Sequence, residues 1–148
     1  MIDKIQVTID VIIHATEDIS KIYQSFKELL NLKEENFTIH ETTGHFDNQI
    51  IILNAKIVKK EAQNFMKKLL GLLSIEQINQ LIEEIEERTV DSRFHMRLDK
   101  QELIKGNLAF GEKETIKIMR AKGFSDCFFR AYQLNQQQPL FFDYTLLF

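Results

Sequence analysis

A chain of 148 residues with a net charge of −3 and one cysteine is long enough for one domain of ordinary size, residues 1–148, without disulfides. A lone cysteine excludes an intramolecular disulfide and a zinc site built on a thiol pair, so we expect a cytoplasmic protein with no cofactor. No stretch approaches the ~20 apolar residues that span a bilayer, and charges interrupt the N-terminal apolar run, so we expect no membrane anchor and no export signal.

The first elements are expected to be a strand and a helix. Apolar residues fall on alternate positions from Ile5 to Ile13, which is typical of a strand with one buried face. Thr16 is expected to cap the following helix, in which apolar residues recur every three or four positions from Ile19 to Leu30. The chain therefore begins with a β-α unit.

A hairpin is expected next. A second strand is predicted at about residues 36–42, a turn at 44–48 and a third strand at 49–58. The run from Ile50 to Leu53 is apolar on both faces, which favours a central strand.

Two helices and three strands complete the predicted fold. The helices are expected at residues 59–72, ending near Gly71, and at 75–88, opened by a capping pair of Ser74 and Gln77. Strands are expected around residues 94–98, 103–110 and 114–122. This order predicts an α+β fold with a mostly antiparallel sheet of five or six strands and about three helices on one face.

The segment after residue 122 does not fit this pattern. Eight of the 25 residues from Phe124 to Phe148 are aromatic, without helical or strict strand periodicity. We expect this aromatic-rich tail, residues 123–148, to bury its rings against the sheet or against another chain, or to be partly disordered. If the rings are buried against a second copy of this chain, we expect the protein to be a homodimer.

Signals for catalysis are missing. The sequence contains no glycine-rich phosphate loop, no dinucleotide-binding motif and no nucleophile elbow. His40 and His45 bracket a turn and could ligate a metal in a hydrolase, but their spacing fits exposed turn residues better. The glutamates among residues 83–87 are typical of a solvated helix face. We therefore expect a binding protein that is not an enzyme.

Positive charge gathers in the last third of the chain. Residues 92–148 carry nine Lys and Arg against six Asp and Glu, +3, although the whole chain is acidic. Arg97 alternates with apolar residues and is expected to point away from the core, where its planar guanidinium could bind phosphate. An ion pair of Arg97 with Asp99 is the competing interpretation. The candidate RNA-binding residues are Arg97, Lys100, Gln101, Lys105, Lys117 and Arg120.

Three motifs carry a family resemblance. HATED at residues 14–18, TGHFDN at 43–48 and RLDKQ at 97–101 together resemble an archaeal family of predicted exosome-associated RNA-binding proteins. The resemblance covers roughly residues 3–120 and departs from the family pattern at Thr43, at Asp47 and after Lys122. It implies a fold similar to ribosomal protein L-five, and RNA binding beside the exosome.

Two functional hypotheses follow from these observations. The first is a non-catalytic, RNA-binding accessory protein that contacts the phosphate backbone through the basic segment and associates with exosome proteins. The alternative is a protein-interaction or dimerisation module that binds no RNA. The sequence does not indicate which RNA or which partner protein would be bound.

Overall fold

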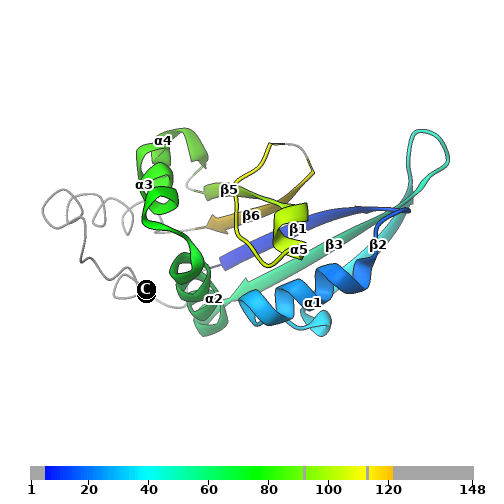
Figure 1. The fold of residues 1–148 in the computed structure, drawn as a ribbon, viewed down its shortest axis with the longest axis horizontal. Helices are drawn as coiled ribbons and strands as arrows, with labels where there is room; N and C mark the ends of the chain where they lie inside the picture. The colour runs from blue at the N-terminus through cyan, green and yellow to red at the C-terminus, as the bar shows by residue number, and fades with distance from the viewer. Residues whose placement is uncertain (1–5, 92, 113, 122–148) are drawn as a thin grey trace, which may run out of the picture. The chain divides into compact units, whose positions relative to one another are not determined.

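The computed structural model describes residues 6–91, 93–112 and 114–121, with side chains as far as Ile118 in the last strand. The aromatic-rich tail lies outside these residues, so its burial stays a prediction. Figure 1 shows the order of helices and strands along the chain.

Six strands form one sheet with the order β2-β3-β1-β6-β5-β4. The pairs β2/β3 and β4/β5 are antiparallel, and the first runs from Phe37 opposite Ala55 to Thr43 opposite Gln49. The α+β prediction with an antiparallel sheet is confirmed. The strands are β1 (Gln6–His14), β2 (Phe37–Thr43), β3 (Gln49–Val58), β4 (Thr89–Val90), β5 (Arg93–Asp99) and β6 (Thr115–Ala121).

The helices follow the predicted apolar stripes. Helix α1 begins after Asp18, and α3 opens with the Ser74–Gln77 capping box that the sequence predicts. The helices are α1 (Ile19–Leu30), the short 3-10 helix η2 (Glu34–Asn36), α2 (Lys59–Leu72), α3 (Ile75–Glu83), α4 (Ile85–Arg88) and α5 (Lys100–Ile104).

The chain divides into two compact units. We call Thr8–Ile57 with Met96–Ile118 the site-bearing unit; it contains α1, η2, β2 and α5. The other unit contains Val58–His95 and therefore α2, α3, α4 and β4. The prediction of a single domain over all 148 residues is not tested by this division.

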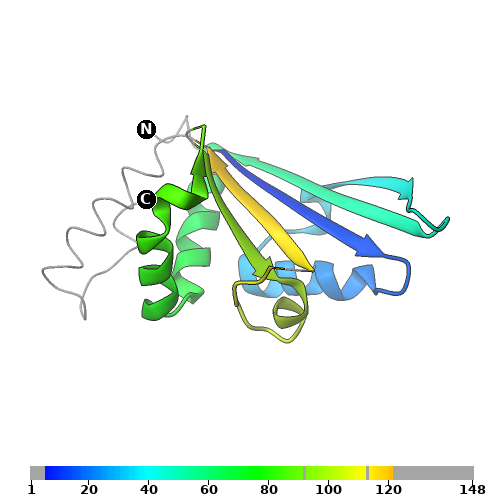
Figure 2. The ribbon, with the colours of Figure 1, turned by 90° about the horizontal axis from the view of Figure 1, so that it is seen from above.

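The core of the site-bearing unit lies between the strands and two helices. Val11 and Ile13 of β1 are buried together with Ile22 and Phe26 of α1, and Leu103 of α5 is also fully buried. Helices α1 and α5 contact each other, and Figure 2 shows both on the same side of the strands. The opposite face of these strands carries no helix in the described part of this unit.

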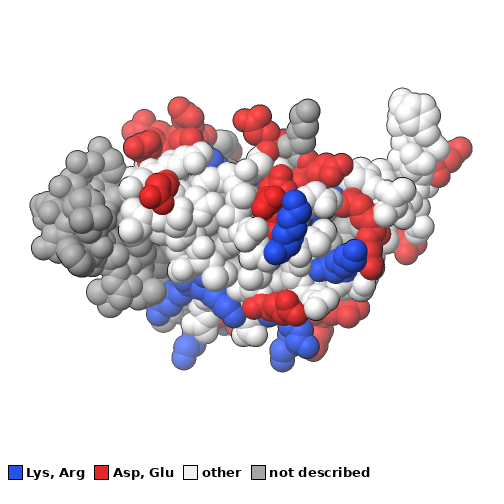
Figure 3. All heavy atoms as spheres, viewed as in Figure 1, with Lys and Arg blue, Asp and Glu red and all other residues white. Residues whose placement is uncertain are grey.

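The core of the other unit is formed by its helices. The stripe of α2 buries Ala62, Phe65 and Met66, and the stripe of α3 buries Ile78 and Leu81. These residues match the periodicity that predicted both helices. The acidic side of α3 and α4 stays in solvent, and Figure 3 shows Asp and Glu side chains gathered over these two helices.

One predicted strand is wrong. Residues 103–110 form the end of α5 and a turn, and only Phe110 joins the sheet, through an isolated bridge to Leu98. The side chain of Asp99 accepts a hydrogen bond from the backbone N–H of Glu102 at 2.9 Å and so opens a helix where a strand was expected. Gly106, with φ +92°, then supports the turn that follows.

Helix ends also differ from the prediction. Asp18, not Thr16, caps α1, because its carboxylate accepts from the Ser20 N–H at 3.0 Å. Helix α2 ends at Leu72, as the predicted range of residues 59–72 has it, but the helix predicted at residues 75–88 is divided into α3 and α4 at Glu84.

Candidate functional site

Two of the sequence motifs meet at Lys100. This residue begins α5 and is only 1% exposed. Its ammonium donates to the backbone carbonyl of Ile12 at 2.7 Å and to Oε1 of Glu17 at 2.8 Å. The HATED loop after β1 and the RLDKQ segment are thereby joined through one buried cation.

The Glu17 carboxylate accepts a second hydrogen bond besides the one from Lys100. Its Oε1 also accepts from the backbone N–H of His14 at 2.9 Å. Burial raises the pKa of the Glu17 carboxyl, but the hydrogen bonds from Lys100 and His14 and the charge of Lys100 outweigh burial, so the pKa lies below its ordinary value. The carboxylate is therefore ionised at neutral pH and balances Lys100.

The segment before β6 holds the start of α5 in place. Backbone N–H groups of Asp99 and Lys100 donate to the carbonyls of Ala109 at 2.7 Å and Glu114 at 3.1 Å. Gly111 passes so close that an added Cβ would lie 3.2 Å from the Cα of Asp99. A larger residue would require Asp99 to shift by a few tenths of an ångström, so the close packing favours glycine at this point.

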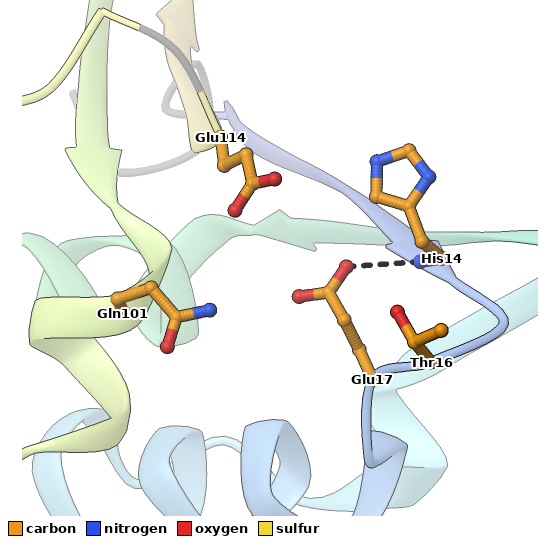
Figure 4. Close-up of a pocket in the computed structure, with 5 residues that line it drawn as sticks. All are labelled: His14, Thr16, Glu17, Gln101 and Glu114. Carbon is orange, nitrogen blue, oxygen red and sulfur yellow. Dashed lines mark hydrogen bonds between the residues drawn. The ribbon is translucent and has the colours of Figure 1, made fainter.

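A hollow of about 530 Å³ opens beside this network. It is lined by His14 at the end of β1, by Thr16 and Glu17 of the loop that follows, by Gln101 of α5 and by Glu114 before β6. In Figure 4 the carboxylates of Glu17 and Glu114 and the amide of Gln101 point toward one common space. All five lining residues belong to the site-bearing unit.

Two expected phosphate contacts share the open face of the strands. Met96 and Leu98 are buried on either side of Arg97, as Ile116 and Ile118 are around Lys117, so both cations are exposed on the face without helices. Strands β5 and β6 are neighbours in the sheet. Arg97 and Lys117 therefore lie on adjacent strands of one surface.

Neither of these cations is paired in the part of the chain that the structure describes. Asp99, the expected partner of Arg97, instead uses its carboxylate to cap α5. The described residues contain three salt bridges, and none of them includes Arg97 or Lys117. The intramolecular ion pair between Arg97 and Asp99 is therefore not formed.

The structure does not place the other four expected RNA-binding residues, Lys100, Gln101, Lys105 and Arg120, on this surface. Lys100 is a correction: its ammonium is enclosed and paired, so it cannot contact phosphate. Gln101 lines the hollow, and Lys105 is an exposed residue at the end of α5, 3.4 Å from Glu102. Arg120 belongs to β6, but its side chain lies outside the described residues.

An exposed aromatic residue was missed by sequence reasoning. Phe46 is 81% exposed at the tip of the hairpin between β2 and β3, which extends beyond the strands in Figure 1. The turn is closed by the Gly44 N–H, which donates to the Asn48 carbonyl at 2.6 Å. The ring of His45 meets Phe46 edge to face with centroids 5.4 Å apart. The sequence signal for this exposed ring is a phenylalanine inside a short turn, because turn residues lie at the surface.

Metal and membrane sites are not found among the described residues. No group of three His, Cys, Asp or Glu side chains in residues 6–91, 93–112 and 114–121 could hold a metal ion. Within those ranges no helix has both the length and the apolar character needed to cross a bilayer.

Comparison with known proteins decides the family. A family model described as RNA binding matches residues 6–121. The chain belongs to this RNA-binding family. A Pyrococcus abyssi protein named RNA-binding protein is 34% identical over 116 residues, which cover 74% of this chain and 75% of the relative. An uncharacterized protein of Methanocaldococcus jannaschii is 32% identical over 106 residues, 68% of this chain and 71% of the relative.

Solved structures of the DUF54 group share the fold. A crystal structure from Sulfolobus solfataricus matches with a TM-score of 0.76 and 26% identity, over 90% of this chain and 98% of the other. A second, from Archaeoglobus fulgidus, matches with a TM-score of 0.67 and 26% identity, over 78% and 84% of the two chains. The family is an RNA-binding one, and both of these relatives are archaeal proteins. The likeness to ribosomal protein L-five stays a prediction.

Proposed function

We propose that this chain binds RNA without catalysis, through the open strand face of the site-bearing unit. The observation that carries the proposal is the pair Arg97 and Lys117, exposed on neighbouring strands without an anionic partner among the described residues. Membership of an RNA-binding family supports the same assignment. Unpaired cations are free to neutralise phosphates, whereas paired ones would first have to lose their partner.

The chemistry of the face suits an extended single strand. Arg97 offers a planar fork for phosphate oxygens, and Lys117 offers a point charge. Ile12 of β1, 50% exposed, adds apolar surface on the same face, because its neighbours Val11 and Ile13 point into the core. Phe46 adds an aromatic ring on which a base can stack, and such stacking contributes about 1–3 kcal/mol per base.

A double substitution tests this surface. Arg97→Ala with Lys117→Ala should weaken binding of a short single-stranded RNA at low salt by about tenfold or more, since two charge-assisted contacts are lost. Lys27→Ala with Lys33→Ala is the matched control, because both lysines are exposed and belong to α1 and the loop after it. Equal losses in both double variants would show that binding follows net charge and not the open face.

The finer role that we propose is an accessory one, in the cytoplasm beside an RNA-degrading exosome. Its support is the resemblance of the three motifs at residues 14–18, 43–48 and 97–101. Co-elution of the full chain with reconstituted archaeal exosome proteins, with and without RNA, tests this role. Separate elution under both conditions would contradict it.

Dimerisation without RNA is the second candidate function. Strand β2 lies at one end of the sheet, so the backbone groups on its outer side have no neighbouring strand in the described sheet. Ile39 on this strand is 50% exposed, although its register places it opposite the buried Leu53. Two such edges paired about a two-fold axis would cover both isoleucines. A monomer mass by light scattering across micromolar concentrations would contradict the dimer.

A further inference from the structure

The open strand face carries exposed apolar side chains beside its cations. Ile12 of β1 is 50% exposed there. Ile52 of β3 is half-buried on the same face, because its neighbour Leu53 is fully buried on the opposite one. His40 of β2 is exposed and lies directly opposite Ile52 in the register of the β2/β3 pair, and register partners share a face. Three neighbouring strands thus contribute apolar or flat aromatic surface to one face.

A hydrogen bond between side chains aligns β1 with β3. The amide of Asn54 in β3 donates to the carboxylate of Asp10 in β1, so these two residues lie side by side. The two strands are neighbours in the sheet and run in opposite directions in Figure 1. Two residues further along β1 and two residues back along β3, Ile12 therefore lies opposite Ile52. His40, Ile52 and Ile12 form one row across β2, β3 and β1, which we call the apolar row.

The charges beside the apolar row decide which part of an RNA covers it. The strand order β3-β1-β6-β5 places Lys117 and Arg97 beyond β1, on one side of the row. The Asp10 carboxylate lies next to the row on β1. A phosphate is repelled by this carboxylate and attracted by the two cations, whereas an uncharged base is not repelled. Phosphates are therefore expected over β5 and β6, and bases over β1 and β3.

The spacing of the strands fits this division of a nucleotide. Neighbouring strands lie ~4.8 Å apart, so β6 is one such spacing from β1 and two from β3, which is ~5–10 Å. A phosphate at Lys117 and its own base on Ile12 or Ile52 are then within reach of each other. Paired bases of a duplex are turned toward the inside of the helix and would not reach the row, so the row fits a single strand.

We propose that the apolar row binds an unpaired base of the bound RNA. The base packs on Ile12 and Ile52 and against the imidazole ring of His40, while its phosphate lies at Lys117 or Arg97. Bases splayed out of single-stranded RNA stack on aromatic rings, including that of His, and such contacts tolerate every base because each has a flat face. The inference rests on the proposed function, because the cations of the open face hold the backbone and the apolar row then receives the base.

A base-free RNA separates contacts to bases from contacts to phosphates. Ten-nucleotide oligouridine and a ribose-phosphate chain of the same length without bases carry the same charge, and both would be titrated against the full chain at constant salt. Wild type should bind oligouridine at least about fivefold more tightly, the lower end of what one stacked base contributes. Ile12→Ala with His40→Ala should lower the oligouridine affinity by about fivefold. The same variant should bind the base-free chain as wild type does, which also shows that it is folded.

Two controls locate the effect. Ile39→Ala removes an isoleucine of β2 that is equally exposed, at 50%, but lies opposite the buried Leu53 and therefore on the other face, so it should keep both affinities. The double variant of Ile12 and His40 loses no lysine or arginine, so its slope of log affinity against log salt should stay that of wild type. An equal loss of oligouridine affinity in Ile39→Ala, or a reduced slope in the double variant, would overturn the base site.

The failure of the base site and the failure of RNA binding give different results. If wild type binds both chains equally and in a salt-sensitive way, the base site is overturned and the proposed function stands. If wild type binds neither chain at micromolar concentration, both are overturned. If the double variant keeps its oligouridine affinity but loses self-association in light scattering, the apolar row contacts a second copy of this chain, and the base site is overturned as well.

Discussion

Lys100 shows why a charged residue cannot be assigned to the surface from its type alone. On the sequence, it follows an alternating strand and looks like one more exposed cation, yet its ammonium is enclosed by Ile12 and Glu17. The signal that would have placed it is the acidic residue of a distant motif, and only the fold brings Glu17 and Lys100 together, 83 positions apart.

Removing Lys100 should therefore affect folding more than RNA binding. Lys100→Ala leaves the Glu17 carboxylate largely buried without its counter-charge, and breaking a buried pair in this way costs about 3–5 kcal/mol. Denaturant unfolding of the single and double variants measures this. Lys100→Met combined with Glu17→Leu should recover most of the loss, because no uncompensated charge remains, and a double variant as unstable as Lys100→Ala would contradict the ion-pair explanation.

Glu17 should make part of the stability depend on pH. Its pKa in the folded chain lies below the ordinary value of 4.5, so the unfolded state binds the proton more tightly. The contribution is complete at pH values well above 4.5 and is lost as the pH falls through the lower folded pKa.

A comparison of wild type with Glu17→Gln over pH measures this contribution. The difference in the free energy of unfolding should be constant near pH 7 and should shrink below about pH 5, as the wild-type carboxyl takes up its proton. A difference in the free energy of unfolding that stays the same down to pH 3 would show that the contribution of Glu17 to stability does not depend on its charge.

At the scale of elements, the pattern of apolar residues predicted strands correctly, except where a capping residue started a helix first. The strand expected at residues 49–58 is β3 as observed, because apolar residues continue at alternate positions after Leu53, at Ala55 and Ile57, and the strand is bounded by a turn and a helix. The strand expected at 103–110 failed because Asp99 caps a helix first. Asp99 followed three residues later by Glu102 is a helix-start pattern, and it predicts α5 where the apolar residues after it predict a strand.

The cap at Asp99 should be measurable by itself. Asp99→Ala removes the acceptor for the Glu102 N–H and should lower the free energy of unfolding by about 1 kcal/mol, within the usual range of 0.5–2 for a cap. Asp99→Asn should keep most of that stability, since asparagine caps helices about equally well. Thermal or denaturant unfolding compares the three proteins. Equal stability of Asp99→Ala and wild type would show that the backbone contacts of residues 109–114 are enough to hold α5.

At the scale of the whole molecule, half of the candidate site could be predicted. Arg97 and Lys117 could be placed because alternate residues of a strand point to opposite faces, and their apolar neighbours fix which face is buried. The convergence of Glu17, Gln101 and Glu114 around one hollow depends on three segments distant in sequence, and no local pattern contains it. The tail at residues 123–148 lies outside the described residues, so the burial expected of its aromatic rings stays a prediction.

The central claim is that unpaired cations on the open strand face hold the RNA backbone. The measurement that tests it is the salt dependence of binding to a single-stranded oligouridine, for wild type and for the Arg97→Ala and Lys117→Ala double variant. About −0.7 in the slope of log affinity against log salt is expected per phosphate contact, so three to five contacts predict a wild-type slope of roughly −2 to −4. The double variant should lose about 1.4 of that magnitude. A wild-type slope near zero, or the same slope in both proteins, would contradict the account.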